Sequence, residues 1–173
     1  EMCIRDRVGS MDSVLISNLY VEIPEGKPDA GYEYEGPIEH MPRNISPASI
    51  IGLKGHPITH VTLKNVVINH PGAGKSEIAK VGITPEELDK VPELADSYPE
   101  FSCFKELPAW GLYLRHVEGI ALENITFIAR KRDYRPAIVL DDAHHVNMSK
   151  MKIQEPGKKK QQIHVYQSTN ITK

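Results

Sequence analysis

The 173-residue chain lacks most of the features that mark a specialised class of protein. It has only two cysteines, Cys3 and Cys103, so its composition does not indicate a disulfide framework. No apolar run approaches the roughly 18 residues of a membrane-spanning helix, and we expect no membrane span. A net charge of -2 gives no basic footprint for nucleic acid. With 40% apolar and 25% charged residues, the composition favours one soluble domain with a core.

What the chain does contain is an eight-residue phrase that occurs four times. VTLKNVVI begins at Val61, and related phrases begin at Val14, Ile120 and Val146. In each phrase the first, third, sixth and eighth positions are apolar, and the fifth is Asn, or once Lys. Such internal repetition predicts structural units that stack on one another.

The spacing inside the phrase predicts two short strands with a bend between them. Val61 and Leu63 alternate as strand residues do, but the step of three to the next apolar pair would turn that pair to the opposite face of a flat strand. Asn enters the left-handed backbone region more readily than most residues, so a bend at Asn65 keeps all four apolar side chains inside. The spacing is not helical. The same position is held by Asn18 and Asn124.

Short apolar stretches that open with Pro-Ala precede the later phrases, at Pro47, Pro108 and Pro136. Proline suits the first residue of a strand. One unit then contains three strands and cannot bury its apolar face without neighbours. This unit resembles a coil of a right-handed parallel β-helix. Leucine-rich repeats are the nearest alternative, but they place Asn three residues after the second leucine, not two. We therefore predict an all-β right-handed parallel β-helix, a solenoid.

The first residues differ from the rest of the chain. MCIRDR, from Met2, looks like the translation of an adapter used in sequencing libraries. We therefore expect residues 1–11 to be an artefact and a junction, which are excluded from fold reasoning. Residues 12–173 are then the C-terminal coils of a β-helix domain truncated at its N-terminus.

The intervals between phrases predict two insertions, since phrases begin 47, 59 and 26 residues apart. The shortest interval is one bare coil, so residues 24–46 and 71–107 are additional, and both leave the coil at the same corner. Insertions on one face of a solenoid often bind ligands. The second one contains a capping box, with Thr84 as N-cap and Glu87 three residues later, which predicts a short helix.

The first insertion contains the candidate sugar-binding residues. Tyr32 and Tyr34 offer ring faces to sugar C–H groups, while Glu35 and Arg43 can bind hydroxyls or, for the arginine, a uronate. Trp110, after the second insertion, is predicted to join the same wall. The alternating Tyr and Glu residues equally fit a half-exposed strand packed along the outside of the coils.

Longer segments add a family resemblance. Together, PDAGYEYEGP, MPRNISPASIIGL, GHPI, FKELPAWGLYLRH and AIVLDD resemble the C-terminal half of bacterial polygalacturonase-like proteins of glycosyl hydrolase family 28, in the pectate-lyase-like superfamily. The resemblance implies a secreted or periplasmic enzyme that hydrolyses pectin-like polysaccharides with inversion. Its aspartates would act as general acid and base. No metal or other cofactor is expected, and the oligomeric state stays open.

The family's catalytic motifs are missing from this chain, so we predict no catalytic residue within it. Asn-Thr-Asp, Gly-His-Gly and Arg-Ile-Lys do not occur. The pair Asp141 and Asp142 is followed by AHHV instead of an apolar strand, which predicts a charged turn. His144 and His145 are adjacent on a strand, point oppositely and therefore cannot easily share a metal ion.

Two classes of function remain at this level. The intact parent is a glycoside hydrolase whose catalytic coils lie upstream of residue 12, or it is a non-catalytic β-helix that binds carbohydrate, such as an adhesin. A calcium-dependent polysaccharide lyase is a weaker third alternative. A polysaccharide is the expected partner.

Overall fold

The computed structural model describes residues 8–25, 46–72, 82–96, 104, 107–157 and 161–173. Within these ranges the chain is mostly β, with eight strands and one short helix, so the all-β prediction is confirmed. The strands are β1 (Asp12–Glu22), β2 (Ala48–Ile51), β3 (Ile58–His70), β4 (Leu112–Ala129), β5 (Ile138–Ser149), β6 (Lys152–Gln154), β7 (Ile163–Tyr166) and β8 (Thr169–Thr172). The helix is α1 (Pro85–Leu88). Among the described helices, none has the length and apolar character needed to cross a membrane.

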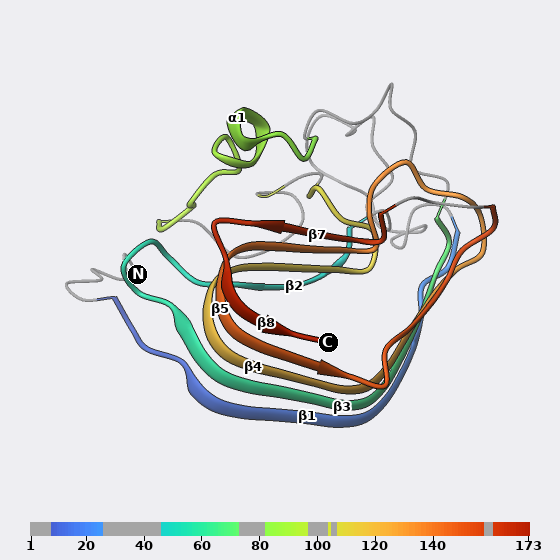
Figure 1. Cartoon of the computed structure of the whole chain (residues 1–173), viewed down its shortest axis with the longest axis horizontal. Coiled ribbons are helices and arrows are strands. Elements are labelled where there is room, and N and C mark those ends of the chain that lie inside the picture. Colours follow the sequence, from blue (N-terminus) through green and yellow to red (C-terminus); the bar gives the residue numbers. More distant parts are fainter. Residues whose placement is uncertain (1–7, 26–45, 73–81, 97–103, 105–106, 158–160) are drawn as a thin grey trace, which may run out of the picture.

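All eight strands belong to one parallel sheet. The main order is β1-β3-β4-β5-β7, while β2 and β6 pair with β4, and β8 pairs with β5. Figure 1 shows β1, β3, β4 and β5 following one another around the same bends. The phrases are in register: Val14 pairs with Val61, Leu63 with Leu122 and Ile120 with Val146. The predicted stacking of the repeated phrases is confirmed.

The bends occur where Asn interrupts the apolar alternation, as predicted. Asn18, Asn65 and Asn124 have φ values of 55°, 54° and 56°. Their side chains form a ladder, in which Asn65 Nδ2 donates to Asn18 Oδ1 and Asn124 Nδ2 donates to Asn65 Oδ1, both at 2.9 Å. Lys150, which takes the Asn position in the fourth phrase, has a φ of 54° without an amide for the ladder.

Two further sets of left-handed residues bend the strands, and the sequence analysis missed both. The register places Arg115 beside Asp141 and Tyr166, so the residues that follow them lie together at one bend. The second additional bend follows the pairing of Asp12 with Thr59, Glu118 with His144, and His144 with Thr169. The first set is His116, Asp142 and Gln167, and the second is Ser13, His60, Gly119, His145 and Asn170. These residues share a backbone conformation, but no single residue type occupies either bend throughout the stack.

The apolar side chains form two clusters on opposite sides of the sheet. The larger one contains the inward positions of the phrases, and Val61 and Val66 are each only 2% exposed. In the smaller one, Leu88 and Val91 of the second insertion pack with Tyr113 and Val139 of β4 and β5. The helix α1 lies in that insertion, and Thr84 N donates to Glu87 Oε2 at 3.1 Å, as the capping box predicts. The insertion therefore covers the outer face of these strands.

Candidate functional site

A cluster of ionisable side chains lies where the second insertion meets β4 and β5. Tyr113, Arg115 and Asp141 alternate with the inward residues of their strands, so they point outward beneath the insertion. At the next residue of each strand the backbone bends through His116 and Asp142. The bend turns these two side chains toward the edge of the insertion. The cluster therefore has a buried half and a half that reaches solvent.

Asp141 is the centre of the buried half and is 3% exposed. Its Oδ2 accepts a hydrogen bond from Tyr113 Oη at 2.6 Å and lies 3.4 Å from Arg115 Nε. Burial raises the pKa of Asp141, and the bond from Tyr113 and the charge of Arg115 only partly oppose that rise. Burial and the neighbouring Asp141 also raise the pKa of Tyr113.

Arg115 links this buried carboxyl group to the second insertion. Its Nη2 lies 3.3 Å from Glu93 Oε1, and its Nη1 donates to the carbonyl oxygen of Val91 at 2.5 Å. One guanidinium thus contacts β5 and two residues of the insertion. Because Asp141 is covered and already engaged by Tyr113 and Arg115, it offers no open face to a substrate. This half of the cluster fastens the insertion to the sheet.

His116 is the centre of the other half and lies between two carboxylates. Its Nδ1 is 2.6 Å from Asp142 Oδ2, and its Nε2 is 2.9 Å from Glu93 Oε1. Asp142 Oδ1 is also 2.9 Å from His144 Nε2. Burial acts to raise the pKa of Asp142, but the hydrogen bonds from the two imidazoles outweigh it and lower the pKa. Glu93 has a lowered pKa as well, because bonds from His116 and the Lys54 amide outweigh its burial. Both carboxylates are therefore charged at neutral pH.

A small pocket of about 200 Å³ opens beside this second half. Its polar lining comes from His116, Glu118, Asp142 and His144, and Gly55 and Pro57 form part of its wall. Imidazoles and carboxylates of this kind can hydrogen-bond the hydroxyl groups of a neutral ligand. An anionic group such as a uronate would meet the charges of Glu118 and Asp142 and be repelled. Among the described residues there is no group of three or more side chains arranged to hold a metal ion.

Of the residues predicted to bind sugar, the structure describes only Trp110, which is not part of this cluster. Tyr32, Tyr34, Glu35 and Arg43 lie outside the described residues, so their prediction stays untested. Trp110 is 0% exposed and sits in the interior. Its ring makes an edge contact with Phe127, with centroids 6.3 Å apart, and lies 6.0 Å from the ring of His70. Neither face of the indole is open to a sugar, because the apolar repeat draws this large ring inward.

The paired aspartates only partly follow their prediction as a charged turn. Asp142 does occupy a bend, with a φ of 54°, but Asp141 is a buried strand residue beneath the insertion. That prediction is wrong for Asp141, because no pattern in its own strand shows that a distant segment covers it. The two histidines turn to different partners: His144 contacts Asp142 and Thr169, and His145 contacts Asn170.

The sequence analysis also missed His116 and Glu93. A usable signal for the former existed, since His116 and Asp142 each lie four residues before an apolar phrase, at Ile120 and Val146. Two polar residues at the same offset in stacked units must be neighbours. No comparable signal marks Glu93, which reaches the cluster from an insertion outside the repeat.

Comparison with known proteins yields no match. No family model, no curated protein and no solved structure corresponds to this chain.

Proposed function

We propose that this chain forms coils of a right-handed parallel β-helix and that it is part of a glycoside hydrolase acting on pectin-like polysaccharides by inverting hydrolysis. The observation that carries the architecture is the in-register parallel pairing of four successive phrases around common left-handed bends. The reaction rests on the resemblance of segments such as PAWGLYLRH and AIVLDD to the polygalacturonase-like family. In this proposal the enzyme is secreted or periplasmic.

Within such an enzyme the described coils have a supporting role. The carboxyl groups of the cluster are engaged, since Asp141 bonds to Tyr113, and Asp142 and Glu93 bond to His116. An inverting pair needs two carboxyl groups about 6.5–9.5 Å apart with room for a water and a sugar ring between them. Here an imidazole fills the space between Asp142 and Glu93. The general acid and base therefore come from other coils, and the insertions contribute to the substrate wall.

The test compares two proteins on the same substrates. A longer reading frame that contains this sequence should release reducing ends from polygalacturonate or a related pectin, and NMR should show the inverted anomer first. Residues 12–173 alone should release none. A hydrolytically active fragment, or a longer protein that retains the anomeric configuration, would overturn the proposal.

A non-catalytic carbohydrate-binding protein is the second candidate. The specific observation in its favour is the pocket beside His116 and Asp142, which offers hydrogen-bonding groups but no free acid–base pair. In that case the longer protein should bind neutral oligosaccharides in calorimetry without cleaving them. An unsaturated product would instead identify a polysaccharide lyase.

A further inference from the structure

The burial of equivalent side chains changes steadily across the stack. At the third position of the phrase, Leu122 in β4 is 0% exposed, Leu63 in β3 is 8% and Ile16 in β1 is 42%. At the sixth position, Ile125 is 0% exposed and Leu19 is 41%. These residues face the same interior, so the difference arises because β1 pairs only with β3 among the described strands.

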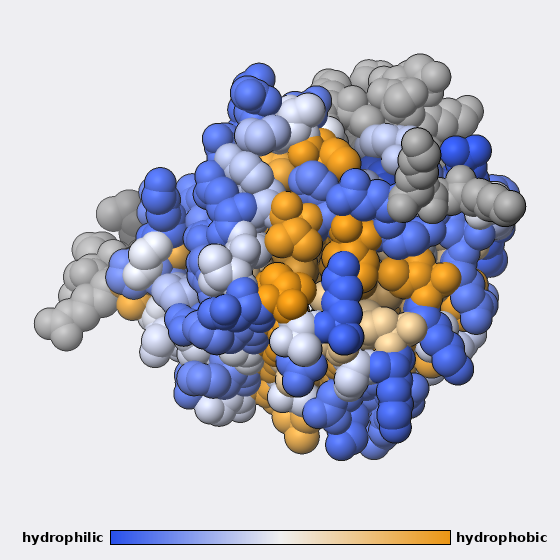
Figure 2. All heavy atoms as spheres, in the orientation of Figure 1, coloured by the Kyte–Doolittle hydropathy of each residue, from blue (hydrophilic) through white to orange (hydrophobic). Residues whose placement is uncertain are grey.

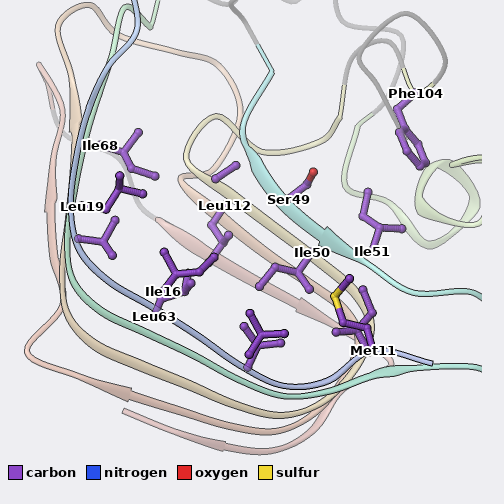
Figure 3. A pocket seen from close by; sticks show the side chains of 15 residues that line it. Met11, Ile16, Leu19, Ser49, Ile50, Ile51, Leu63, Ile68, Phe104 and Leu112 are labelled. Atoms are coloured by element: carbon purple, nitrogen blue, oxygen red, sulfur yellow. The ribbon is translucent and has the colours of Figure 1, made fainter. Parts of the chain in front are cut away.

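The interior consequently opens to solvent at the β1 end. A groove of about 430 Å³ lies between β1 and β2, and its lining is almost wholly apolar. Figure 3 shows Ile16 and Leu19 from β1 and Ile50 from β2 pointing into this shared space, with Leu63 and Leu112 behind them. In Figure 2, apolar side chains gather near the middle of the face shown and are ringed by hydrophilic ones. Such a contiguous apolar surface marks an interaction site.

The polar groups at this end indicate what kind of occupant fits. In a parallel strand every second residue directs its backbone N–H and C=O groups to the far side, and β1 has no described neighbour there. The asparagine ladder also stops at this point. Asn18 Oδ1 accepts from Asn65, but no described residue accepts a hydrogen bond from Asn18 Nδ2. A helix or a lipid would cover the groove and leave both the strand edge and the amide unsatisfied, which is costly once they are buried.

We propose that the open edge of β1 and β2 is the docking surface for one further coil of the same repeat, joined to this chain on the N-terminal side of β1. Its strand runs parallel to β1 and places apolar side chains opposite Val14, Ile16, Leu19 and Val21. Opposite Asn18 it carries Asn or another side chain with an oxygen acceptor, which continues the ladder. This inference rests on the β-helix architecture proposed above and is independent of the proposed hydrolytic activity.

A second copy of the chain fits this edge less well. The far end of the stack presents β7 and β8, which contain four residues each, whereas β1 contains eleven. Suppose that Asn170 of that copy stacked on Ser13, as it stacks on His145 within the chain. Thr172, the last residue of β8, would then lie opposite Leu15. Leu19 and the Asn18 amide would remain uncovered. A further coil with a full-length strand satisfies both.

The experiment supplies such a coil from the chain's own sequence. Residues 120–145 form one bare repeat, and a copy of them joined directly before Val14 replaces residues 1–13. The copied Leu122 then stacks on Ile16, the copied Asn124 on Asn18 and the copied Ile138–Asp141 stretch on β2. We expect amide hydrogen exchange in β1 to slow by at least about tenfold relative to the original chain. Binding of a hydrophobic dye and concentration-dependent self-association should fall together.

Two matched fusions separate a docked coil from mere added length. One carries Leu122→Asp and Ile125→Asp in the copy only, and it should leave exchange in β1 unchanged. The other carries Asn124→Gly in the copy, which keeps the bend but removes the acceptor, and should give an intermediate gain. In the original chain, the β1 amides should stay unprotected even where the chain forms oligomers. Protection of β1 amides in an oligomer would identify a second copy as the occupant.

The proposal is overturned if the unmodified fusion leaves β1 exchanging as fast as before. A fusion that loses its β-sheet circular dichroism also contradicts it, since a coil matched in register should stabilise the edge. Neither readout involves a sugar, so a failure to hydrolyse pectin would refute the proposed function and leave this inference standing.

Discussion

The units built on β1 and β4 carry the same phrase and the same Asn bend, yet they differ sharply in what the phrase achieves. In β4 the inward residues Leu122, Ile125 and Phe127 are all 0% exposed. In β1 the inward Leu19 is 41% exposed. Full burial of a Leu or Ile side chain stabilises a protein by about 1.5–3 kcal/mol. The comparison teaches that a repeat encodes the direction of its side chains, while its neighbours determine how much stability each side chain contributes.

The largest expected effect concerns the ion pairs of the two regions. Arg115→Met removes the cation that contacts Asp141 and Glu93 beneath the insertion, and breaking a buried pair from one side costs about 3–5 kcal/mol. Lys131→Met breaks an exposed pair with Glu25, next to the open unit, and should cost far less, because water and salt screen an exposed pair. Urea unfolding of both variants measures the difference. Similar costs for the two would contradict the assigned role of Arg115.

A second pair of variants applies one substitution to both units. Leu122→Ala in β4 should lower the free energy of unfolding by about 2–5 kcal/mol, because it leaves a cavity in a closed interior. Leu19→Ala in β1 should cost less than about 1 kcal/mol, because water already reaches its side chain. Adding the copied coil before Val14 should raise the cost of Leu19→Ala toward that of Leu122→Ala. Equal costs in the original chain would show that the two units are equally covered.

The asparagine ladder gives a smaller contrast. Asn65→Ala removes two amide hydrogen bonds and places Ala in a left-handed conformation, for an expected loss of about 1–3 kcal/mol. Asn18→Ala removes one such bond, and we expect roughly half that loss. Asn65→Gly keeps the backbone freedom and isolates the contribution of the hydrogen bonds. Thermal unfolding midpoints should rank Asn65→Ala below Asn65→Gly and Asn18→Ala.

The smallest effect is a pH dependence at the exposed half of the cluster. The pKa of Asp142 is lowered in the folded protein, so its contribution to stability is present above its unfolded pKa, about 3.9, and is lost as the pH falls below that value. In Asp142→Asn, the free energy of unfolding should therefore fall less steeply as the pH is lowered from about 5 to about 3. Asp141 has a raised pKa and the opposite sign: its contribution is present at low pH and is lost as the pH rises through its folded pKa.

The control for that prediction comes from the open unit. Asp12 accepts hydrogen bonds from Thr59 and His60, which lower its pKa, but it is solvent-exposed and screened. Asp12→Asn should change the pH dependence of the free energy of unfolding at acid pH less than Asp142→Asn does. The prediction fails if unfolding followed by circular dichroism gives the same change in the free energy of unfolding with pH, at acid pH, in the original chain and in Asp142→Asn.

Local sequence patterns predicted the parts of the fold that depend on neighbouring residues. The bends at Asn18, Asn65 and Asn124 followed from a break in the apolar alternation, and Thr84 with Glu87 predicted the start of α1. The other bends were not predictable in the same way. They use residues as different as His116 and Gly119, because the register of stacked strands imposes the left-handed conformation there.

The candidate site could be predicted from the sequence far less well. The burial of Arg115 and Asp141 was not predicted, because it depends on Val91 and Glu93, which come from an insertion with no repeat to align. Trp110 shows the reverse problem, since a large aromatic residue suited to sugar binding is drawn into the interior. Contact between segments distant in sequence decided both cases.

The sequence by itself determined which side chains face inward and where the asparagines turn the backbone, because both properties depend on alternation and local conformational preference. Tertiary structure alone decided which of those faces are closed, that Asp141 is buried and Asp142 is not, and that the interior opens at β1. The physical reason is that burial, charge pairing and the hydrogen bonding of strand edges depend on contacts between units, and the residues of one unit cannot specify them.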